Sequence, residues 1–392
     1  MEADAKATAG VTNWLGYQPA LDGLRGLAVI QVVLFHARLP GFNNGQVGVG
    51  VFFVLSGFLI THLIVSEIGR SGRFSLSNFY LRRVRRLLPA YVCVVVFCVA
   101  ASLVMQNWAT LRGALASMVY VSNWALVFNP QKGLGMLAHT WTLSIEEQFY
   151  FLWPAILLFL SKKSMYVVNR AIITGILLLS TLSCICLILF LLPASPSKPV
   201  LLSTLGGYIM LMSGSLFALF LCQSGSLARR VLQFLRWGFA MDMLAALAIC
   251  AIAVTSTIDS SHLSEDWQPT MLWMAVVPAS FVLIGAAVFS RGAAHWWLTR
   301  SALVRLGTIS YGLYLWHFPI FYLFDTYFGL SNIINGCFAA GASLIVASLS
   351  FNLIEAPFKK SGFDAVPFAW LKERIVSMKG GRPLAKPSDE LS

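Results

Sequence analysis

The sequence predicts an all-α polytopic membrane protein with about ten transmembrane helices and a re-entrant or interfacial segment around residues 106–143. Hydrophobic residues make up 58% of the 392 residues and charged residues only 11%, whereas a water-soluble domain normally carries about a quarter charged residues. The net charge of +12 lies mostly in short clusters between apolar runs. This distribution indicates membrane topology rather than nucleic-acid binding.

Ten apolar segments approach the ~20 residues that a spanning helix needs. They are 24–39, 47–68, 87–105, 144–161, 167–192, 203–222, 240–257, 271–290, 307–328 and 333–355. The basic clusters between them all fall on one face: Arg70 to Arg86, Lys162 to Arg170, Arg229 to Arg236, Arg291 to Arg305, and the tail from Lys359. By the positive-inside rule, both termini are then cytoplasmic. The loops on the outer face are consistent with this topology, because they carry few basic residues: "PASPSKP" has one lysine and "DSSHLSEDWQP" is acidic.

The segment 106–143 does not fit as a further span, because counting "ALASMVYVSNWALVF" would send Lys162, Lys163 and Arg170 to the outer face. Irregular backbone at membrane depth must be buried in protein or line a cavity. We therefore expect this segment to form part of a site wall. The chain then divides into a cytoplasmic N-terminal segment (1–19), a membrane domain (20–358) and a cytoplasmic tail (359–392).

Arg25 and His36 stand at the two ends of the first apolar run. Eleven residues of helix return to nearly the same face, ~16 Å further along the axis. Charged groups facing lipid are expensive, so both side chains should face the bundle interior. The structural alternative is an arginine that reaches the inner boundary and a histidine hydrogen-bonded at the outer one.

The stretch "SNFYLRRVRRLLPAY" places an arginine block directly before the third span. One interpretation is an anchor on anionic lipid. The other is a phosphate clamp, because guanidinium groups pair with phosphate oxygens in bidentate fashion. A coenzyme A donor would offer such phosphates.

The stretch "AHTWTLSIEEQFYFLWP" opens the fourth span. Ser144 and Glu147 have the spacing of a capping box at a helix start. A capping box uses one carboxylate, whereas this stretch has two adjacent ones. On a helix, the side chains of adjacent residues point in directions about 100° apart. We expect one of Glu146 and Glu147 to serve the helix end and the other to face the interior, with His139 sharing that cavity.

Six stretches in order resemble the acyltransferase 3 family of bacterial integral-membrane O-acyltransferases. They are "LDGLRGLAVIQVVLFH", "VGVFFVLSGFLIT", the block Phe79, Arg82, Arg83, Arg86 and Pro89, "WTLSIEEQFY", "LGTISYGLYLWHFPIF" and "LIEAPFKK". The resemblance implies transfer of an acyl group, commonly acetyl, from cytoplasmic acyl-CoA to hydroxyls of extracytoplasmic carbohydrate, in a bacterial inner membrane. The acceptor would be an exopolysaccharide, an O-antigen, a peptidoglycan sugar, a glycolipid or a smaller metabolite.

The resemblance also implies residue roles. His36 would be the catalytic histidine, Arg25 its paired basic residue and Glu147 an essential acid, and the donor-side contacts would be Arg82, Arg83 and Arg86. Supporting candidates are Asp22, His139, Ser144, Glu146 and His317. Many family members carry an additional extracytoplasmic hydrolase-like domain; we expect none in this chain, so a separate partner protein could complete the transfer.

These residues suggest one passage through the membrane. Coenzyme A would dock on the arginine block, and its arm would pass Arg25 to present the thioester near His36. A neutral His36 could act as general base on the acceptor hydroxyl, oriented by Glu146 or Glu147 as a carboxylate does in a hydrolytic triad. An acyl-histidine intermediate is the alternative route. Acyl-CoA is a co-substrate here, and no bound cofactor is expected.

Two other interpretations remain. A transporter or flippase could use His36 and Glu147 for proton coupling, because such residues also mark proton relays; a scaffold would use its charges for topology alone. His317, near the middle of the ninth span, is either a site residue or a structural hydrogen-bonding group. Glu355 is expected to pair at a helix end or in a loop. The seven cysteines show no metal-ligand spacing, and we expect no metal site.

Overall fold

The computed structural model describes residues 16–71, 73–161, 167–191, 198–222, 226–258, 267–329 and 333–361. These ranges are helical and contain no strand. The helices are α2 (Pro19–His36), α3 (Gln46–Ser71), α4 (Leu76–Met105), α5 (Trp108–Met118), α6 (Ser122–Phe128), α7 (Thr140–Ser161), α8 (Val167–Leu191), α9 (Lys198–Leu221), α10 (Ser226–Leu235), α11 (Gly238–Thr257), α12 (Trp267–Phe289), α13 (Ala293–Leu298), α14 (Ser301–Thr308), α15 (Ser310–Phe328), α16 (Ile333–Ser350) and α17 (Ala356–Ser361). The 3₁₀ turns η1 (Pro130–Lys132) and η2 (Gly135–Leu137) precede α7, and the π-helical turn η4 (Phe351–Glu355) joins α16 to α17.

Each of the ten predicted spans coincides with a helix, which confirms the all-α class. The count of ten is not confirmed. In the described part of the chain, seven segments are both long and apolar enough to cross a membrane: α2, α3, α4, Thr140–Leu160 of α7, α9, α11 and Ile333–Lys359. Shorter apolar stretches occur at Ala171–Cys186 in α8 and Met274–Phe289 in α12. α15 falls short because tyrosines, His317 and Asp325 lower its hydropathy.

The arginine block lies within α4 and not before it, which corrects the predicted boundary of the third span. α4 begins at Leu76, where the Ser75 side chain accepts a hydrogen bond from the backbone N–H of Asn78 at 3.3 Å. A serine in this position satisfies one of the free N–H groups of the first turn. Because the helix starts early, Arg86 lies three and four residues after Arg83 and Arg82, so the three side chains are neighbours on its surface.

α3 is the central helix and packs against α2, α7, α9 and α12. Its contact with α9 depends on two glycines. A Cβ atom on Gly57 would lie 1.9 Å from the carbonyl oxygen of Leu211, and one on Gly214 would lie 1.9 Å from that of Val54. Only glycine permits such close approach of two helix backbones. α14 reaches α2 in the same way, through Gly307.

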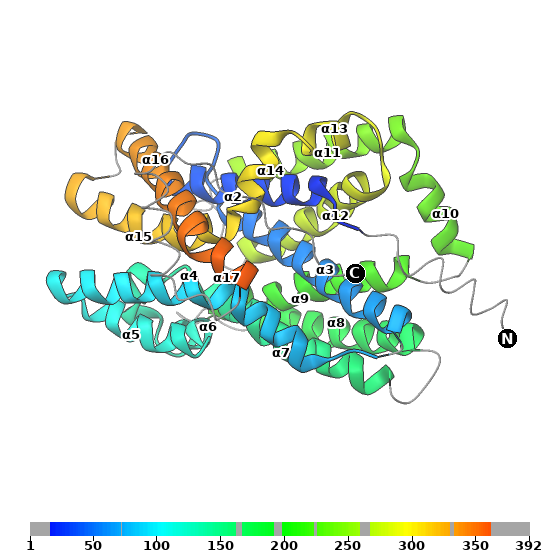
Figure 1. The fold of residues 1–392 in the computed structure, drawn as a ribbon, viewed down its shortest axis with the longest axis horizontal. Helices are drawn as coiled ribbons and strands as arrows, with labels where there is room; N and C mark the ends of the chain where they lie inside the picture. The colour runs from blue at the N-terminus through cyan, green and yellow to red at the C-terminus, as the bar shows by residue number, and fades with distance from the viewer. Residues whose placement is uncertain are drawn as a thin grey trace, which may run out of the picture.

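The segment 106–143 forms short helical pieces rather than one long helix. α5 lies alongside α4 (Figure 1), and α6 packs on α7 and α9. Between α5 and α6, Tyr120 has a left-handed backbone with φ of 52°, which is uncommon for a bulky residue. Its ring stacks on Tyr91 at 5.1 Å, and its carbonyl accepts a 2.6 Å hydrogen bond from Gln148. These contacts hold Tyr120 against the site described below.

Several predicted topology features lie outside the described residues. These are Lys162 and Lys163, most of the loop "PASPSKP", most of "DSSHLSEDWQP", the segment before residue 16 and the tail beyond residue 361. The side on which the termini lie and the proposed division into three segments stay predictions.

Candidate active site

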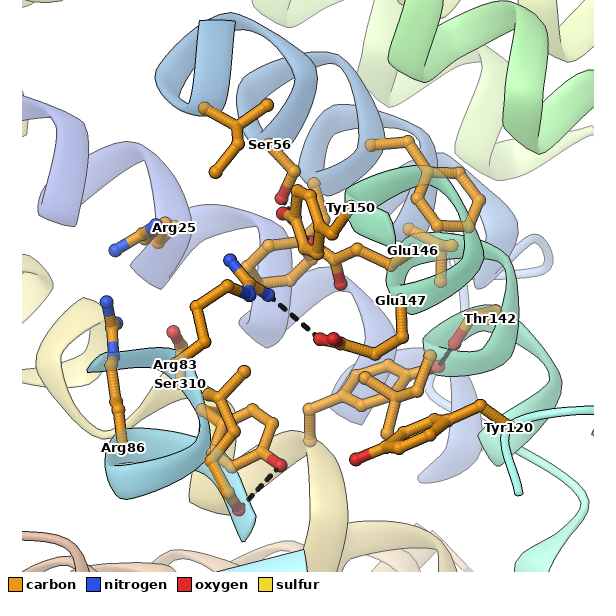
Figure 2. A pocket seen from close by; sticks show the side chains of 18 of the residues that line it. Arg25, Ser56, Arg83, Arg86, Tyr120, Thr142, Glu146, Glu147, Tyr150 and Ser310 are labelled. Atoms are coloured by element: carbon orange, nitrogen blue, oxygen red, sulfur yellow. Dashed lines mark hydrogen bonds and ion pairs between the residues drawn. The ribbon is translucent and has the colours of Figure 1, made fainter. Parts of the chain in front are cut away.

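A cavity of about 310 Å³ lies between α2, α3, α4, α7 and α15. Ligand pockets in proteins begin at about this size. Its polar lining residues from α2, α4 and α7 are Arg25, Arg82, Arg83, Arg86, Thr142, Glu146, Glu147 and Tyr150. The predicted arginine block and the two carboxylates therefore meet in one place, and Figure 2 shows Arg83 and Arg86 beside Glu146 and Glu147.

The cationic part of the cavity combines two helices that are far apart in the sequence. Arg25 comes from α2, and Arg86 extends from α4 toward it (Figure 2). Arg25 has Asp22 as a partner at 3.6 Å, and Arg82 has Glu67 at 3.3 Å. Arg86 has no ion pair among the described residues. Four guanidinium groups and two carboxylates thus line the cavity, so it favours an anionic ligand.

Glu147 pairs with Arg83 and not with His36, which corrects the predicted triad-like arrangement. Its Oε1 accepts a 2.8 Å hydrogen bond from Arg83 Nη2, and both side chains are about three-quarters buried. The Arg83 guanidinium also lies 3.6 Å from the centre of the Tyr150 ring, an arrangement that stabilises a cation. Glu147 therefore holds the Arg83 guanidinium in place.

Glu146 lines the same cavity, so the expectation that one carboxylate would serve the helix end is wrong. It accepts hydrogen bonds from the hydroxyl groups of Ser56 and Tyr150. The two carboxylates diverge along α7, as a helix requires, but Glu146 meets α3 while Glu147 meets α4. Both carboxylates are engaged with residues other than histidine.

Ser144 does not form the predicted capping box, because α7 begins earlier, at Thr140. Inside the helix, the Ser144 hydroxyl donates to the Thr140 carbonyl at 3.1 Å. It also accepts a 3.1 Å hydrogen bond from the backbone N–H of Ser122, the first residue of α6. Ser144 therefore satisfies the N-terminus of a different helix from the one predicted.

His36 ends α2, outside the lining of the cavity. Its Nδ1 donates a 2.8 Å hydrogen bond to the Val32 carbonyl, so Nε2 is the free acceptor nitrogen. The ring is half-buried and packs against α15, with centroids 4.9 Å from His317 and 5.4 Å from Phe318. Arg25 and His36 occupy one helix, as predicted, but they contact different parts of the molecule.

His139 and His317 are buried beside His36 rather than beside the carboxylates. His317 is fully buried, its Nδ1 donates to the Tyr314 carbonyl at 2.6 Å, and its ring lies 5.5 Å from that of His139. The expectation that His139 shares the cavity with Glu146 and Glu147 is wrong.

Tyr314 connects the cavity to the histidines and was missed by the sequence reasoning. It lines the cavity, shares a 2.5 Å hydrogen bond with Thr142, and lies 5.2 Å from the His317 ring. A chain of contacts thus leads from the cavity through Tyr314 and His317 to His36. The signal was available in "SYGLYLWHF", where Tyr311, Tyr314 and His317 recur every three residues, a spacing that clusters side chains on one helix face.

Two further histidines and one acid lie apart from these groups. His62 is buried in α3 and stacks on Phe58, and His295 contacts the Ala287 carbonyl at 3.0 Å. Glu355 is buried in the π-helical turn η4 under Gly312, where an added Cβ would lie 2.6 Å from Glu355 Oε1. That oxygen has no hydrogen-bond partner among the described residues, and the helix-end or loop pairing expected for Glu355 stays a prediction.

The helical bundle defines a multi-pass membrane protein with a cavity in its interior that four arginines and two glutamates line. The chain belongs to the acyltransferase domain family, which matches residues 18–351. It is 32% identical over 395 residues to the peptidoglycan O-acetyltransferase OatA of Listeria monocytogenes serovar 1/2a (strain ATCC BAA-679 / EGD-e), covering 94% of this chain and 60% of that protein.

A second relative is the O-acetyltransferase OatA of Staphylococcus aureus (strain NCTC 8325 / PS 47). It is 30% identical over 364 residues, which cover 90% of this chain and 59% of the relative. The chain thus spans about three-fifths of the length of the curated relatives it matches. No solved structure matches the chain at a significant level.

Proposed function

We propose that this protein transfers an acetyl group from cytoplasmic acetyl-CoA to a hydroxyl group of an extracytoplasmic glycan. The observation that carries the proposal is the convergence of Arg25, Arg82, Arg83 and Arg86 on one cavity within a bundle of the acyltransferase family. Because phosphates pair with guanidinium forks, a nucleotide-bearing thioester is a donor that this cavity fits.

The donor end of the proposed passage is the arginine cluster. Arg83 is fixed by Glu147 and Tyr150, so its guanidinium is preorganised. Arg86 has no carboxylate of its own among the described residues and is free to receive a phosphate oxygen. Preorganised cations bind anions with less loss of side-chain freedom.

The acceptor end of the passage is His36. Its Nδ1–H is held by Val32, which leaves Nε2 to take the proton of an acceptor hydroxyl as general base. The hydroxyl oxygen attacks the thioester carbonyl carbon, the C–S bond breaks, and the departing thiolate takes the proton. Since Thr142 and Tyr314 line the cavity and His36 does not, the thioester reaches His36 when the contact between Thr142 and Tyr314 opens.

Peptidoglycan is the acceptor that we propose first, because relatives of this chain are named peptidoglycan O-acetyltransferases. An exopolysaccharide, an O-antigen or a glycolipid offers the same hydroxyl chemistry. The relatives extend well beyond the matched region, and a separate extracytoplasmic partner could complete the transfer. We place the protein in the bacterial inner membrane with both termini cytoplasmic.

The test compares cells that lack the gene with cells that carry wild type or His36→Ala at matched membrane levels. Ester-linked acetate is released by mild alkali from isolated peptidoglycan and from the other surface glycans, and is then measured. We expect the deletion to remove an acetyl signal that wild type restores and His36→Ala does not. Full restoration by His36→Ala would overturn the role of His36, and an unchanged signal in the deletion strain would overturn acetyl transfer to a surface glycan.

A further inference from the structure

The buried Nε2 atom of His317 has no hydrogen-bond partner among the described residues. The side chain is fully buried. Its Nδ1 carries the ring proton, because it donates to the Tyr314 carbonyl at 2.6 Å. Nε2 is therefore an acceptor without a donor. Most buried polar groups in folded proteins are hydrogen-bonded, so an unpaired acceptor beside a proposed catalytic group needs a reason.

His36 and His317 are held in the same way and face one another. Each imidazole donates its Nδ1–H to a carbonyl of the preceding turn, at Val32 and Tyr314 respectively. The two ring centroids are 4.9 Å apart with planes inclined by 70°. Rings at this separation can place one nitrogen of each at the ~3 Å distance of an N–H···N hydrogen bond. While both rings are neutral, no proton is available for that bond.

The surroundings of the pair, within the described ranges, offer no carboxylate to stabilise a charged imidazole. The contacts of the two rings are aromatic: Phe35, Phe318 and Phe321 pack on them, and His139 and Tyr314 lie beside His317. No described acidic residue forms an ion pair with a histidine. An imidazolium in this setting would be uncompensated, and His317, whose ring contacts that of His36, offers an unpaired acceptor at Nε2.

We propose that His317 is a positioning residue that accepts a hydrogen bond from His36 after His36 has been protonated. The proposal rests on the function above, in which His36 Nε2 takes the proton of the acceptor hydroxyl. Once the C–O bond has formed, the ester oxygen is a poor acceptor, and the Nε2–H of His36 turns to Nε2 of His317. The proton then leaves on the thiolate released from the C–S bond, and both imidazoles return to the neutral state.

Two substitutions of similar size separate this role from simple packing. In His317→Gln, the amide nitrogen can donate to the Tyr314 carbonyl while the amide oxygen accepts from His36. His317→Met fills a similar volume with only a weak acceptor. The same exchange at His62, a buried histidine on α3 that stacks on Phe58, is the matched control.

The experiment measures kcat and KM for labelled acetyl-CoA in membranes that contain equal amounts of each folded variant. We expect kcat to fall about 100-fold in His317→Met and about tenfold in His317→Gln, with KM for acetyl-CoA unchanged in both. The His62→Gln and His62→Met variants should have equal kcat values. Equal kcat values for the two His317 variants, or a change in KM alone, would overturn the role of His317.

His36→Ala is assayed alongside, so that the two proposals fail separately. If His36→Ala keeps full activity, the general-base assignment of His36 is wrong. If His36→Ala is inactive and the two His317 variants match each other, the function stands and only the role of His317 is overturned.

Discussion

Arg83 and Glu147 join α4 to α7 across the cavity, with Arg83 Nη2 2.8 Å from Glu147 Oε1. The two residues are 64 positions apart in the sequence. The family resemblance implies an essential role for the acid, and the structure gives a physical reason for one: without Glu147, the guanidinium that faces the donor cavity loses its fixed position. Removing either partner also leaves the other charge largely buried and unpaired, which is unfavourable.

Substitution of this pair should therefore be non-additive. We expect Arg83→Ala and Glu147→Ala each to lower the thermal stability of the detergent-solubilised protein, and the double variant to lose less than the sum. Contacting residues show coupling of about 0.5–3 kcal/mol in such cycles. The measurement is a double-mutant cycle of unfolding free energies, and simple additivity would show that the pair contributes nothing.

Arg86→Ala should weaken acetyl-CoA binding more than Arg82→Ala. Arg82 already interacts with Glu67 at 3.3 Å in an exposed position, whereas Arg86 has no ion pair among the described residues. A hydrogen bond to a charged group contributes about 1.5–3 kcal/mol, so we expect at least about a tenfold rise in Kd for Arg86→Ala. Calorimetric titration of the purified protein with acetyl-CoA tests the order; equal effects would contradict it.

Ser144→Ala should destabilise the protein by about 1 kcal/mol, because the backbone N–H of Ser122 loses the acceptor that caps α6. The effect should appear as a lower thermal midpoint with Glu147 still in place. Ser102→Ala is a comparison at another buried serine, whose hydroxyl donates to the Asn107 carbonyl. An unchanged thermal midpoint in Ser144→Ala would show that this hydroxyl does not cap α6.

Gly57→Ala should prevent close packing of α3 on α9. The added Cβ would lie 1.9 Å from the Leu211 carbonyl oxygen, and backbone cannot yield as a flexible side chain can. We expect a large loss of folded protein in fluorescence-detected size exclusion. Gly341→Ala in α16 is the control, because nothing lies within 4 Å of its Cβ position and alanine is the better helix former. Normal folding of Gly57→Ala would show that α3 and α9 can separate without penalty.

The local pattern of the chain was enough to predict every helix that builds the site. Apolar runs of membrane length placed α2, α3, α4, α7 and α15, and the spacing of Arg25 and His36 placed both on one helix. The six stretches also identified the family. Helix starts were less certain: the arginine block was placed before α4, and Ser144 at the start of α7, because caps depend on single hydrogen bonds that composition does not reveal.

By itself, the sequence determined the all-α membrane class, the family and the residue types of the site, because periodicity and motif order are local properties. Only the tertiary structure decided which groups meet. It placed Glu147 with Arg83, Glu146 with Ser56 and Tyr150, and a second buried imidazole against His36. The physical reason is that these contacts join different helices, and their partners are set by how the glycine-lined backbones pack and rotate against one another, which no short stretch of sequence encodes.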